Sequence, residues 1–515
     1  MSRRACYRVS SIERRRSLTS NRYSTIGDEM FAAGRFDEAM SAYRQALSVS
    51  PRDAQARMGL DAILERARTA QPNADLRTLL LEAYADDGAN WDAVGWGAAN
   101  QLVVGWPADD DLRRLAEDRL LHEFLRKSLN RDAALERKLL ALRKAVAVAE
   151  PSPQMSELIP SLAEQAWLNE YVWPEDPAIG DGPAAAMFRP SATPRAEVVE
   201  EKRLQAEIPE IAPITDAVSL SVQAMYEANP YPRWTHLARR PEIDVRAALM
   251  RDFPHATDVA FGDGPLEVLM PGAGTGQHPL TVASSYVNAR VTGVDLSRAS
   301  LAYGKRMAAH YGVGNIEFLR GDILDLPKLG RTFDHAECVG VLHHMADPKA
   351  GLMAISSVLR PGAFFRVGLY GETARMLVVK ARRDIEAARL PATLDGLREF
   401  RRKVMSGEWR RLRALTEWED FWSASLLRDL CFHVQEHRFT ISLLRAFLEG
   451  SGLRFLGFEF SVGASQSAAV NAGPLEFYRS RYPSERTLSD LARWEQLERE
   501  KSNLFPGYAF VCQKE

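Results

Sequence analysis

A glycine-rich turn followed at a fixed distance by a carboxylate constrains this chain more than any other feature. The apolar residues Leu266, Val268 and Leu269 lead directly into a Gly-x-Gly-x-Gly run over residues 272–276. A second apolar segment ends at Asp295, nineteen residues after the run. This order predicts a strand, a tight turn, a helix and a second strand, with a ligand at the carboxyl edge of a parallel sheet. We expect the glycines to leave room for that ligand, because a Cβ there would occupy its space.

The alternation of strands and helices continues downstream. Further strands are predicted over residues 315–319, 333–339 and 363–369, with residues 359–362 as a turn before the last. Polar and small residues follow the strands, among them Asp322, which is where a doubly wound sheet binds its ligand. The pattern predicts an α/β, doubly wound, Rossmann-like domain.

Residues 264–370 resemble a class I S-adenosylmethionine-dependent methyltransferase. The resemblance implies that the ribose hydroxyls bind Asp295, that the adenine lies near Asp322, and that the end of the fourth strand lies beside the methionine moiety. It implies the following S-adenosylmethionine-binding residues: Gly272, Ala273, Gly274, Gly276, Asp295, Leu296, Asp322, Ile323, Cys338 and Val339. One departure stands out, because the family usually places an acid where this chain has Met270. The contact of that acid with the methionine amino group must be absent or supplied elsewhere.

A dinucleotide-dependent dehydrogenase is the rival interpretation, since those folds also use glycine turns and a ribose-binding acid. The glycines here are spaced Gly-x-Gly-x-Gly and not Gly-x-Gly-x-x-Gly. The segment after the third strand also fits an adenine-binding clamp. The methyltransferase interpretation is therefore favoured.

Composition excludes several other classes. With 46% hydrophobic and 26% charged residues, the chain is an ordinary globular protein, and a net charge of −2 gives no basis for a nucleic-acid or membrane partner. Cys6, Cys338, Cys431 and Cys512 are scattered without metal-ligand spacing. We expect a cytoplasmic protein without a metal site.

The first half of the chain is predicted to be helical. Residues 1–20 read as a disordered basic tail, and residues 21–72 are similar to a tetratricopeptide repeat, with Phe36 and Tyr43 filling the seam between two helices. Residues 73–173 form a helical domain, and residues 174–216 are rich in proline and glycine and predict a linker. The arrangement is similar to that of bacterial proteins with such a repeat ahead of a methyltransferase domain. The helical region has two readings, a peptide-binding surface for a protein partner or a packing cap.

An aromatic arm precedes the glycine turn. A helix should end at Asn229, before Pro230. The arm residues Tyr226, Tyr231, Arg233 and Trp234 then either fold over the cofactor or seal the junction between domains.

The methyltransferase domain is assigned to residues 217–371 and 436–515, with an arginine-rich helical insertion, residues 372–435, as an acceptor cap. Residues 453–460 and 507–513 should form an antiparallel edge, with a helix over 484–501 between them. The segment that includes Asp429, His433, Glu436 and His437 is a candidate lining of the acceptor pocket.

Methyl transfer needs a general base only if the acceptor keeps its proton until late in the reaction. His343, His344 and Tyr370 follow the fourth and fifth strands and are the candidate catalytic residues, although a packing role for the histidine pair is the simpler interpretation. We expect a methyltransferase for a small-molecule or protein acceptor. The alternative is a non-catalytic interaction protein with a degenerate cofactor domain.

Overall fold

The structure is a computed structural model that describes residues 19–149, 153–176, 178–180, 182–259, 264–459, 467–505 and 507–515. Residues 1–18, which are most of the expected basic tail, lie outside the described part. The chain divides into two compact units. Unit 1 comprises residues 1–192, 235–241 and 416–424, and unit 2 comprises residues 193–234, 242–415 and 425–515.

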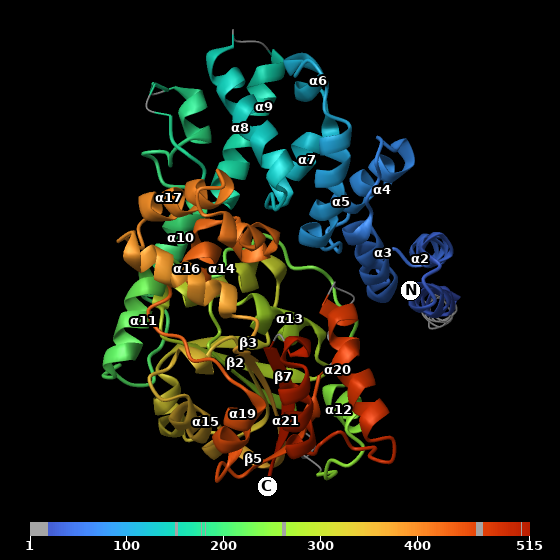
Figure 1. Cartoon of the computed structure of the whole chain (residues 1–515), viewed down its shortest axis with the longest axis vertical. Helices are drawn as coiled ribbons and strands as arrows, with labels where there is room; N and C mark the ends of the chain where they lie inside the picture. Colours follow the sequence, from blue (N-terminus) through green and yellow to red (C-terminus); the bar gives the residue numbers. More distant parts are fainter. Residues whose placement is uncertain are drawn as a thin grey trace, which may run out of the picture. The chain divides into compact units, whose positions relative to one another are not determined.

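All the regular secondary structure described in unit 1 is helical, and the unit is coloured mainly blue to teal in Figure 1. A helix over residues 19–32 is followed by α2 (Phe36–Val49), α3 (Ala54–Arg66), α4 (Ala74–Tyr84), α5 (Trp91–Val104), α6 (Leu112–Ala116), α7 (Arg119–Lys127), α8 (Ala133–Val148), α9 (Pro153–Leu168), η1 (Pro183–Met187) and η5 (Glu419–Phe421). Asn73, Asn90, Asp118 and Asp132 precede α4, α5, α7 and α8, and each accepts a first-turn backbone N–H.

The buried Tyr43 ring organises the first three helices of unit 1. A Cβ added at Gly27 would lie 2.3 Å from Tyr43 Cε1, and one at Gly59 would lie 2.2 Å from Tyr43 Cζ. Glycine at both positions therefore lets the helices close on the ring. Phe36, expected in the same seam, is 45% exposed, because its ring packs edge-on against Phe31 at the surface.

Unit 2 contains a seven-stranded mixed sheet in the order β3-β2-β1-β4-β5-β7-β6. Its strands are β1 (Leu266–Pro271), β2 (Ala289–Asp295), β3 (Ile316–Arg320), β4 (Phe333–Val339), β5 (Leu359–Tyr370), β6 (Leu453–Phe458) and β7 (Gly507–Lys514). Strands β1 to β5 run parallel, and β7 pairs antiparallel with both β5 and β6. The Rossmann-like sheet with an antiparallel edge is thus confirmed.

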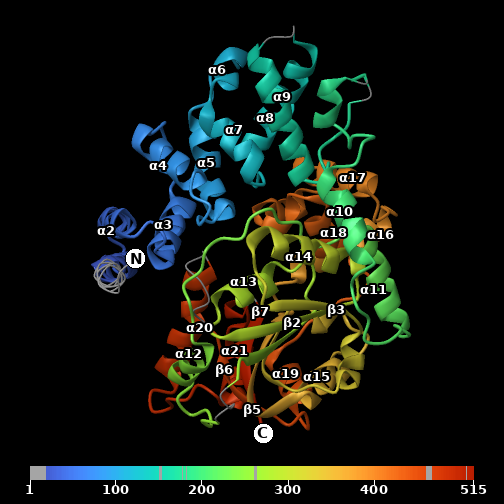
Figure 2. The same cartoon turned by 180° about the vertical axis from the view of Figure 1, so that it is seen from behind.

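Helices cover both faces of the sheet (Figures 1 and 2). The helices that lie wholly or mainly in unit 2 are α10 (Ala196–Gln205), α11 (Ala217–Ala228), α12 (Val245–Asp252), α13 (Gln277–Ser285), α14 (Arg298–Tyr311), η2 (Ile323–Leu329), η3 (Leu342–His344), α15 (Pro348–Ser357), α16 (Met376–Ala387), α17 (Leu394–Met405), η4 (Arg410–Glu417), α18 (Ala424–Phe432), α19 (Ile441–Leu448), α20 (Ser467–Arg481), α21 (Leu491–Glu500) and η6 (Ser502–Leu504). Side chains of α15, α19 and α21 form the larger core against the sheet, whereas α12 and α13 pack on the other face.

Strand β5 begins earlier than the sequence pattern suggests. Residues 359–362 were expected to form a turn, but Leu359 already pairs with Phe333 of β4. The register then shifts so that His335 pairs with Phe364, which absorbs the extra residues as a bulge around Gly362, whose φ is +81°.

The segment expected to be a linker, residues 174–216, contains η1 and α10. Helix α10 packs on α14, where Glu201 pairs with Arg306 at 2.9 Å and Glu207 pairs with Lys305 at 2.8 Å. These contacts make α10 part of unit 2.

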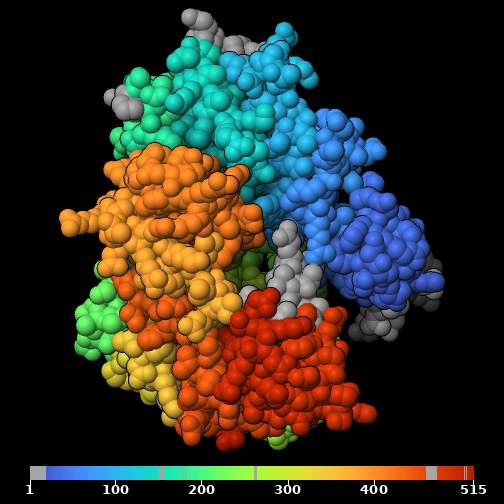
Figure 3. Space-filling model, viewed as in Figure 1, coloured from blue at the N-terminus to red at the C-terminus, as the bar shows by residue number. Residues whose placement is uncertain are grey.

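The insertion after β5 is helical, as expected. Residues 372–415 and 425–435 lie in unit 2 and residues 416–424 in unit 1. The surface of α16 and α17 is orange in Figure 3.

Among all described residues, no helix combines the length and the apolar character needed to cross a membrane.

Candidate cofactor and acceptor site

A cavity of about 220 Å³ lies at the carboxyl ends of β1, β2, β3 and β4. It is bounded by the glycine turn on one side and by α11 and the following arm on another. Its polar or glycine lining comprises Ser219, Tyr226, Tyr231, Gly272, Gly274, Gln277, His278, Asp295, Ser300, Gly321, Asp322, Gly340 and His344. Its apolar lining includes Val218, Val222, Ala273, Leu296, Ile323, Val339, Val341 and Met345.

The glycines of the turn are required by protein neighbours. Gly272 and Gly274 have φ of +75° and +53°, values that favour glycine. A Cβ at Gly272 would lie 2.2 Å from Val341 Cγ2, and a Cβ at Gly274 would lie 2.9 Å from the Tyr231 carbonyl oxygen. A side chain at either position would therefore also strike the loop after β4 or the arm, a constraint that the sequence did not reveal.

Asp295 ends β2 and is tied to the turn that it faces. Its carboxylate accepts the backbone N–H of Gly274 at 2.8 Å and that of Ser297 at 2.9 Å. Desolvation raises the pKa of Asp295, although these two hydrogen bonds oppose the rise. A half-buried carboxylate held in this way at a cavity wall suits recognition of ligand hydroxyls.

Asp322 follows β3 and is 4% exposed. Its side chain caps η2 by accepting the N–H of Leu324 at 3.0 Å, which fixes the carboxyl group beside Ile323. Both residues line the cavity on the β3 side.

The arm is bonded directly to the glycine turn. Thr275 donates its backbone N–H to the Tyr231 carbonyl at 3.3 Å, and Trp234 Nε1 donates to the Thr275 carbonyl at 3.1 Å. Tyr226 and Tyr231 line the cavity. Trp234 is 4% exposed and packs behind the turn against Tyr303. Tyr226 and Tyr231 of the arm therefore face the cavity, whereas Trp234 packs behind the glycine turn.

Of the expected cofactor-binding and arm residues, four do not line the first cavity: Gly276, Cys338, Arg233 and Trp234. Gly276 starts α13 in the left-handed region, where a Cβ would lie 2.8 Å from Gly304 Cα. Cys338 points into the core, where burial raises the pKa of its thiol to about 12. Residues on a strand alternate in direction, and Val339 instead reaches the cavity.

A second cavity, of about 360 Å³, adjoins the first at the ends of β4, β5 and β7. Val339 and Gly340 belong to the walls of both cavities. The remaining lining is mostly apolar and aromatic: His343, Gly368, Leu369, Tyr370, Phe458, Glu459, Pro474, Phe505, Gly507, Tyr508 and Ala509. A molecule in the second cavity would thus contact the same strand end as a molecule in the first.

The two candidate histidines face different cavities. His344 lines the first cavity, and its Nδ1 lies 2.6 Å from the Gln435 carbonyl oxygen. Because a carbonyl only accepts, Nδ1 carries the hydrogen and Nε2 keeps its lone pair. His343 lines the second cavity with Tyr370, and the two rings lie 3.8 Å apart.

His343 is buried without polar partners for its ring. Neither ring nitrogen has a hydrogen-bond partner among the described residues. Burial, followed by the nearby His344 and Arg375, holds the pKa of His343 well below its usual value. The ring is therefore neutral at physiological pH, with a lone pair on one nitrogen.

His344 meets two residues from the end of α18, Asp429 and His433, beside the first cavity. One potential metal-ligand atom from each of His344, Asp429 and His433 lies within 4.8 Å of the others. Sequence spacing gave no metal site, and spacing alone cannot reveal such a cluster. However, His433 Nδ1 accepts the Gln435 N–H at 3.1 Å, so its Nε2 carries the hydrogen in the neutral ring and offers no lone pair. Asp429 instead accepts a hydrogen bond from Tyr226 Oη at 2.6 Å.

Sequence reasoning missed His278, which follows the glycine turn and lines the first cavity. Its Nε2 lies 2.9 Å from Glu337 Oε2, and the Glu337 side chain is fully buried on β4. The sequence held one signal for this residue, because a polar side chain stands two positions after Gly276, the last glycine of the turn.

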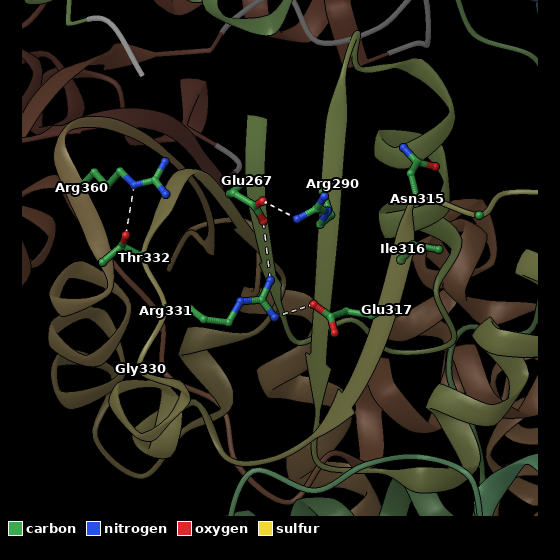
Figure 4. A pocket seen from close by; sticks show the side chains of 10 residues that line it. Glu267, Arg290, Asn315, Ile316, Glu317, Gly330, Arg331, Thr332 and Arg360 are labelled. Carbon is green, nitrogen blue, oxygen red and sulfur yellow. Dashed lines mark hydrogen bonds and ion pairs between the residues drawn. The ribbon is translucent and has the colours of Figure 1, made fainter. Parts of the chain in front are cut away.

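A polar hollow of about 710 Å³ lies at the opposite edge of the sheet, at the amino ends of the strands. Figure 4 shows Glu267 facing Arg290 at 3.1 Å and Arg331, which also pairs with Glu317 at 2.5 Å. Arg360 lies beside Thr332. These charges satisfy one another, and none of the expected site residues lies there, so we assign no function to this hollow.

Several known sequences are similar to parts of this chain. A family model described as a methyltransferase domain matches residues 268–362. An uncharacterized protein of Synechococcus sp. is 31% identical over 257 residues, which cover 48% of this chain and 61% of that relative. A fatty-acid O-methyltransferase of Mycolicibacterium smegmatis is 30% identical over 209 residues, which cover 40% of this chain and 70% of that relative.

Among solved structures, PKMT2 from Rickettsia typhi in complex with AdoHcy aligns with a TM-score of 0.42 and 16% identity, covering 56% of this chain and 55% of that one. The chain thus spans less than two thirds of both the Synechococcus protein and the Rickettsia structure.

Proposed function

Because the chain belongs to the class I S-adenosylmethionine-dependent methyltransferases, we propose that it transfers a methyl group to an oxygen atom of a small-molecule acceptor. Its cofactor is S-adenosylmethionine, which supplies, when bound, a methyl group made electrophilic by the sulfonium. The name of the Mycolicibacterium relative, a fatty-acid O-methyltransferase, supports oxygen as the acceptor atom.

We assign the cofactor to the cavity at the glycine turn. In this assignment Asp295 accepts hydrogen bonds from the ribose hydroxyls, and Asp322 and Ile323 flank the adenine. The turn from Gly272 to Gly274 approaches the methionine part of the cofactor. The two carboxylates at the cavity wall and the close glycine turn suit a ligand with adjacent hydroxyl groups.

The acceptor is assigned to the adjoining cavity. The single observation that carries this assignment is the wall of Val339 and Gly340 that the two cavities share. Residues on this wall hold donor and acceptor in contact and exclude water, which is most of what methyl transfer requires of the protein. His343 faces the acceptor and takes the hydroxyl proton at a ring nitrogen as the new bond forms, while the Tyr370 ring packs against it at a tilt and holds it in place.

Calorimetry of cofactor binding tests the assignment. Asp295→Asn keeps the shape of the side chain but removes the charge that strengthens its bonds to ribose hydroxyls. We expect the affinity for S-adenosylhomocysteine to fall by about 2 kcal/mol, or roughly 30-fold, and the melting temperature to decrease, because the amide nitrogen cannot accept one of the two backbone N–H bonds that Asp295 accepts. Unchanged affinity in a folded variant would show that the cofactor binds elsewhere.

A non-catalytic interaction protein is the second candidate, and the apolar Met270 at the usual position of an acid is the observation that favours it. No heat of binding by the wild-type chain at millimolar S-adenosylmethionine would support this candidate over the enzyme.

For unit 1, we propose a tetratricopeptide-like repeat over residues 21–72, which serves a protein partner or caps the helices that follow. The packing of Gly27 and Gly59 against Tyr43 supports the repeat, because small residues at the crossing of paired helices are its hallmark.

A further inference from the structure

The methionine end of the assigned cofactor cavity has no carboxylate of its own among the described residues. Asp295 and Asp322 lie at the ends of β2 and β3, whereas the half bounded by β1 and β4 is lined by Gly272, Val339 and Gly340 and by the neutral or titratable polar side chains of Gln277, His278 and His344. Met270 on β1 is apolar and 2% exposed. An ammonium group brought into this half would be desolvated and needs an acceptor there.

His278 is the polar side chain in this half that is tied to a buried acid. It lines the cavity and is 41% exposed, and its Nε2 lies 2.9 Å from Glu337 Oε2. Because the carboxylate accepts, Nε2 carries the hydrogen, and Nδ1 of the neutral ring is left with its lone pair.

Glu337 is held as an anion by its surroundings. Burial alone would raise its pKa, but hydrogen bonds from His278 and His335 outweigh burial and hold the pKa of Glu337 well below its usual value. Tyr286 donates to the same carboxylate, and Arg366 Nη1 lies 3.2 Å from it.

The Glu337 carboxylate lies directly behind the His278 ring. Arg366 contacts this carboxylate and also pairs with Glu459 at 2.6 Å, so one guanidinium is shared between two acid side chains. An anion behind the ring favours a cation on the far side of the ring.

We propose that His278, oriented by Glu337, accepts a hydrogen bond from the α-ammonium group of S-adenosylmethionine through Nδ1. The pair supplies from α13 and β4 the contact that Met270 cannot make from β1. This inference rests on the proposed function, because it assumes that the cofactor occupies the cavity at the glycine turn.

Two ligands that differ only at the methionine end test the pair. S-adenosylhomocysteine carries the amino acid group, and 5′-methylthioadenosine lacks it but keeps the adenosine and the sulfur. Calorimetry of the full chain measures both affinities for the wild type, His278→Ala, and the matched control His310→Ala on the exposed face of α14. A His278→Gln variant, whose amide oxygen can accept, probes rescue.

We expect His278→Ala to lower the affinity for S-adenosylhomocysteine by about tenfold or more and the affinity for 5′-methylthioadenosine by less than twofold. In His278→Gln the affinity for S-adenosylhomocysteine should partly recover. The His310→Ala control should change neither affinity. Equal weakening of both ligands would reveal a merely structural role and overturn the inference, as would an unchanged affinity for S-adenosylhomocysteine. If the wild type binds neither ligand, the proposed function and the inference fall together.

Discussion

At the scale of single residues, the chemistry depends on which nitrogen of each histidine is available. His344 has its tautomer set by the Gln435 carbonyl and faces the cofactor cavity. His343 faces the acceptor cavity, and neither of its ring nitrogens has a hydrogen-bond partner in the described part of the chain. Of the two, His343 is therefore the better candidate for the base.

Replacing His343 by asparagine should separate chemistry from binding. We expect kcat for an O-methylated acceptor to fall by about 10²–10⁴-fold, the usual contribution of a general base, with little change in the affinity for S-adenosylhomocysteine. Since the pKa of His343 is lowered, wild-type activity should not decline between pH 7.5 and 6 through protonation of this base. Steady-state kinetics and calorimetry check both statements, and a kcat within twofold of wild type would remove His343 from the mechanism.

At the scale of secondary-structure elements, α11 and α14 are joined at the cofactor cavity. The Glu227 carboxylate, near the end of α11, accepts the backbone N–H of Arg298 at 2.7 Å and of Ala299 at 2.9 Å. Both N–H groups belong to the first turn of α14, the helix that follows Asp295 and Leu296. The negative charge of Glu227 is favourable there, because a helix N-terminus carries a partial positive charge. The arm is thereby fixed to the loop that is assigned to the ribose.

Glu227→Ala should loosen this junction. We expect a loss of stability of about 1 kcal/mol, as for removal of a helix cap, and a several-fold weaker affinity for S-adenosylhomocysteine. Thermal melting and calorimetry provide the measurements, and Glu386→Ala on the exposed side of α16 is the control. The same small change in both variants would mean that the contact with α14 contributes nothing.

At the scale of the whole molecule, a set of buried neutral histidines makes stability depend on pH. Burial, the largest cause in each case, lowers the pKa of His343 and His344 and brings that of His433 to about 2. Below about pH 6.5 the unfolded chain binds a proton at each of these positions and the folded chain does not. Stability should therefore be highest above pH 6.5 and fall as the pH decreases.

Each such histidine contributes up to about 1.4 kcal/mol of destabilisation per pH unit below 6.5. Desolvation raises the pKa values of Asp295 and Asp429, and these groups oppose the trend at more acidic pH. Urea unfolding at pH 7.5 and 5.5 and constant ionic strength should show a lower midpoint at pH 5.5. The pH dependence should be shallower in His433→Gln, and identical midpoints for the wild type at both pH values would contradict this account.

Local sequence patterns determined the sheet and its ligand-binding edge. Apolar runs interrupted by glycine or acid residues predict the parallel strands, because their periodicity and turn chemistry are local properties. They placed β4 at its observed bounds, and they placed Asp295 and Asp322 at strand ends on one cavity. They failed at β5, where a bulge continues the pairing through residues expected to form a turn.

Only the tertiary structure decided which side chains meet. The sequence separates His344 from Asp429, and His278 from Glu337, by dozens of residues, and no periodic pattern links the members of either pair. The reasons for glycine at positions 272 and 274 are likewise distant neighbours, Val341 and Tyr231. Strand and turn formation depend on adjacent residues, whereas a site depends on packing between elements, and packing is fixed only when the whole chain has folded.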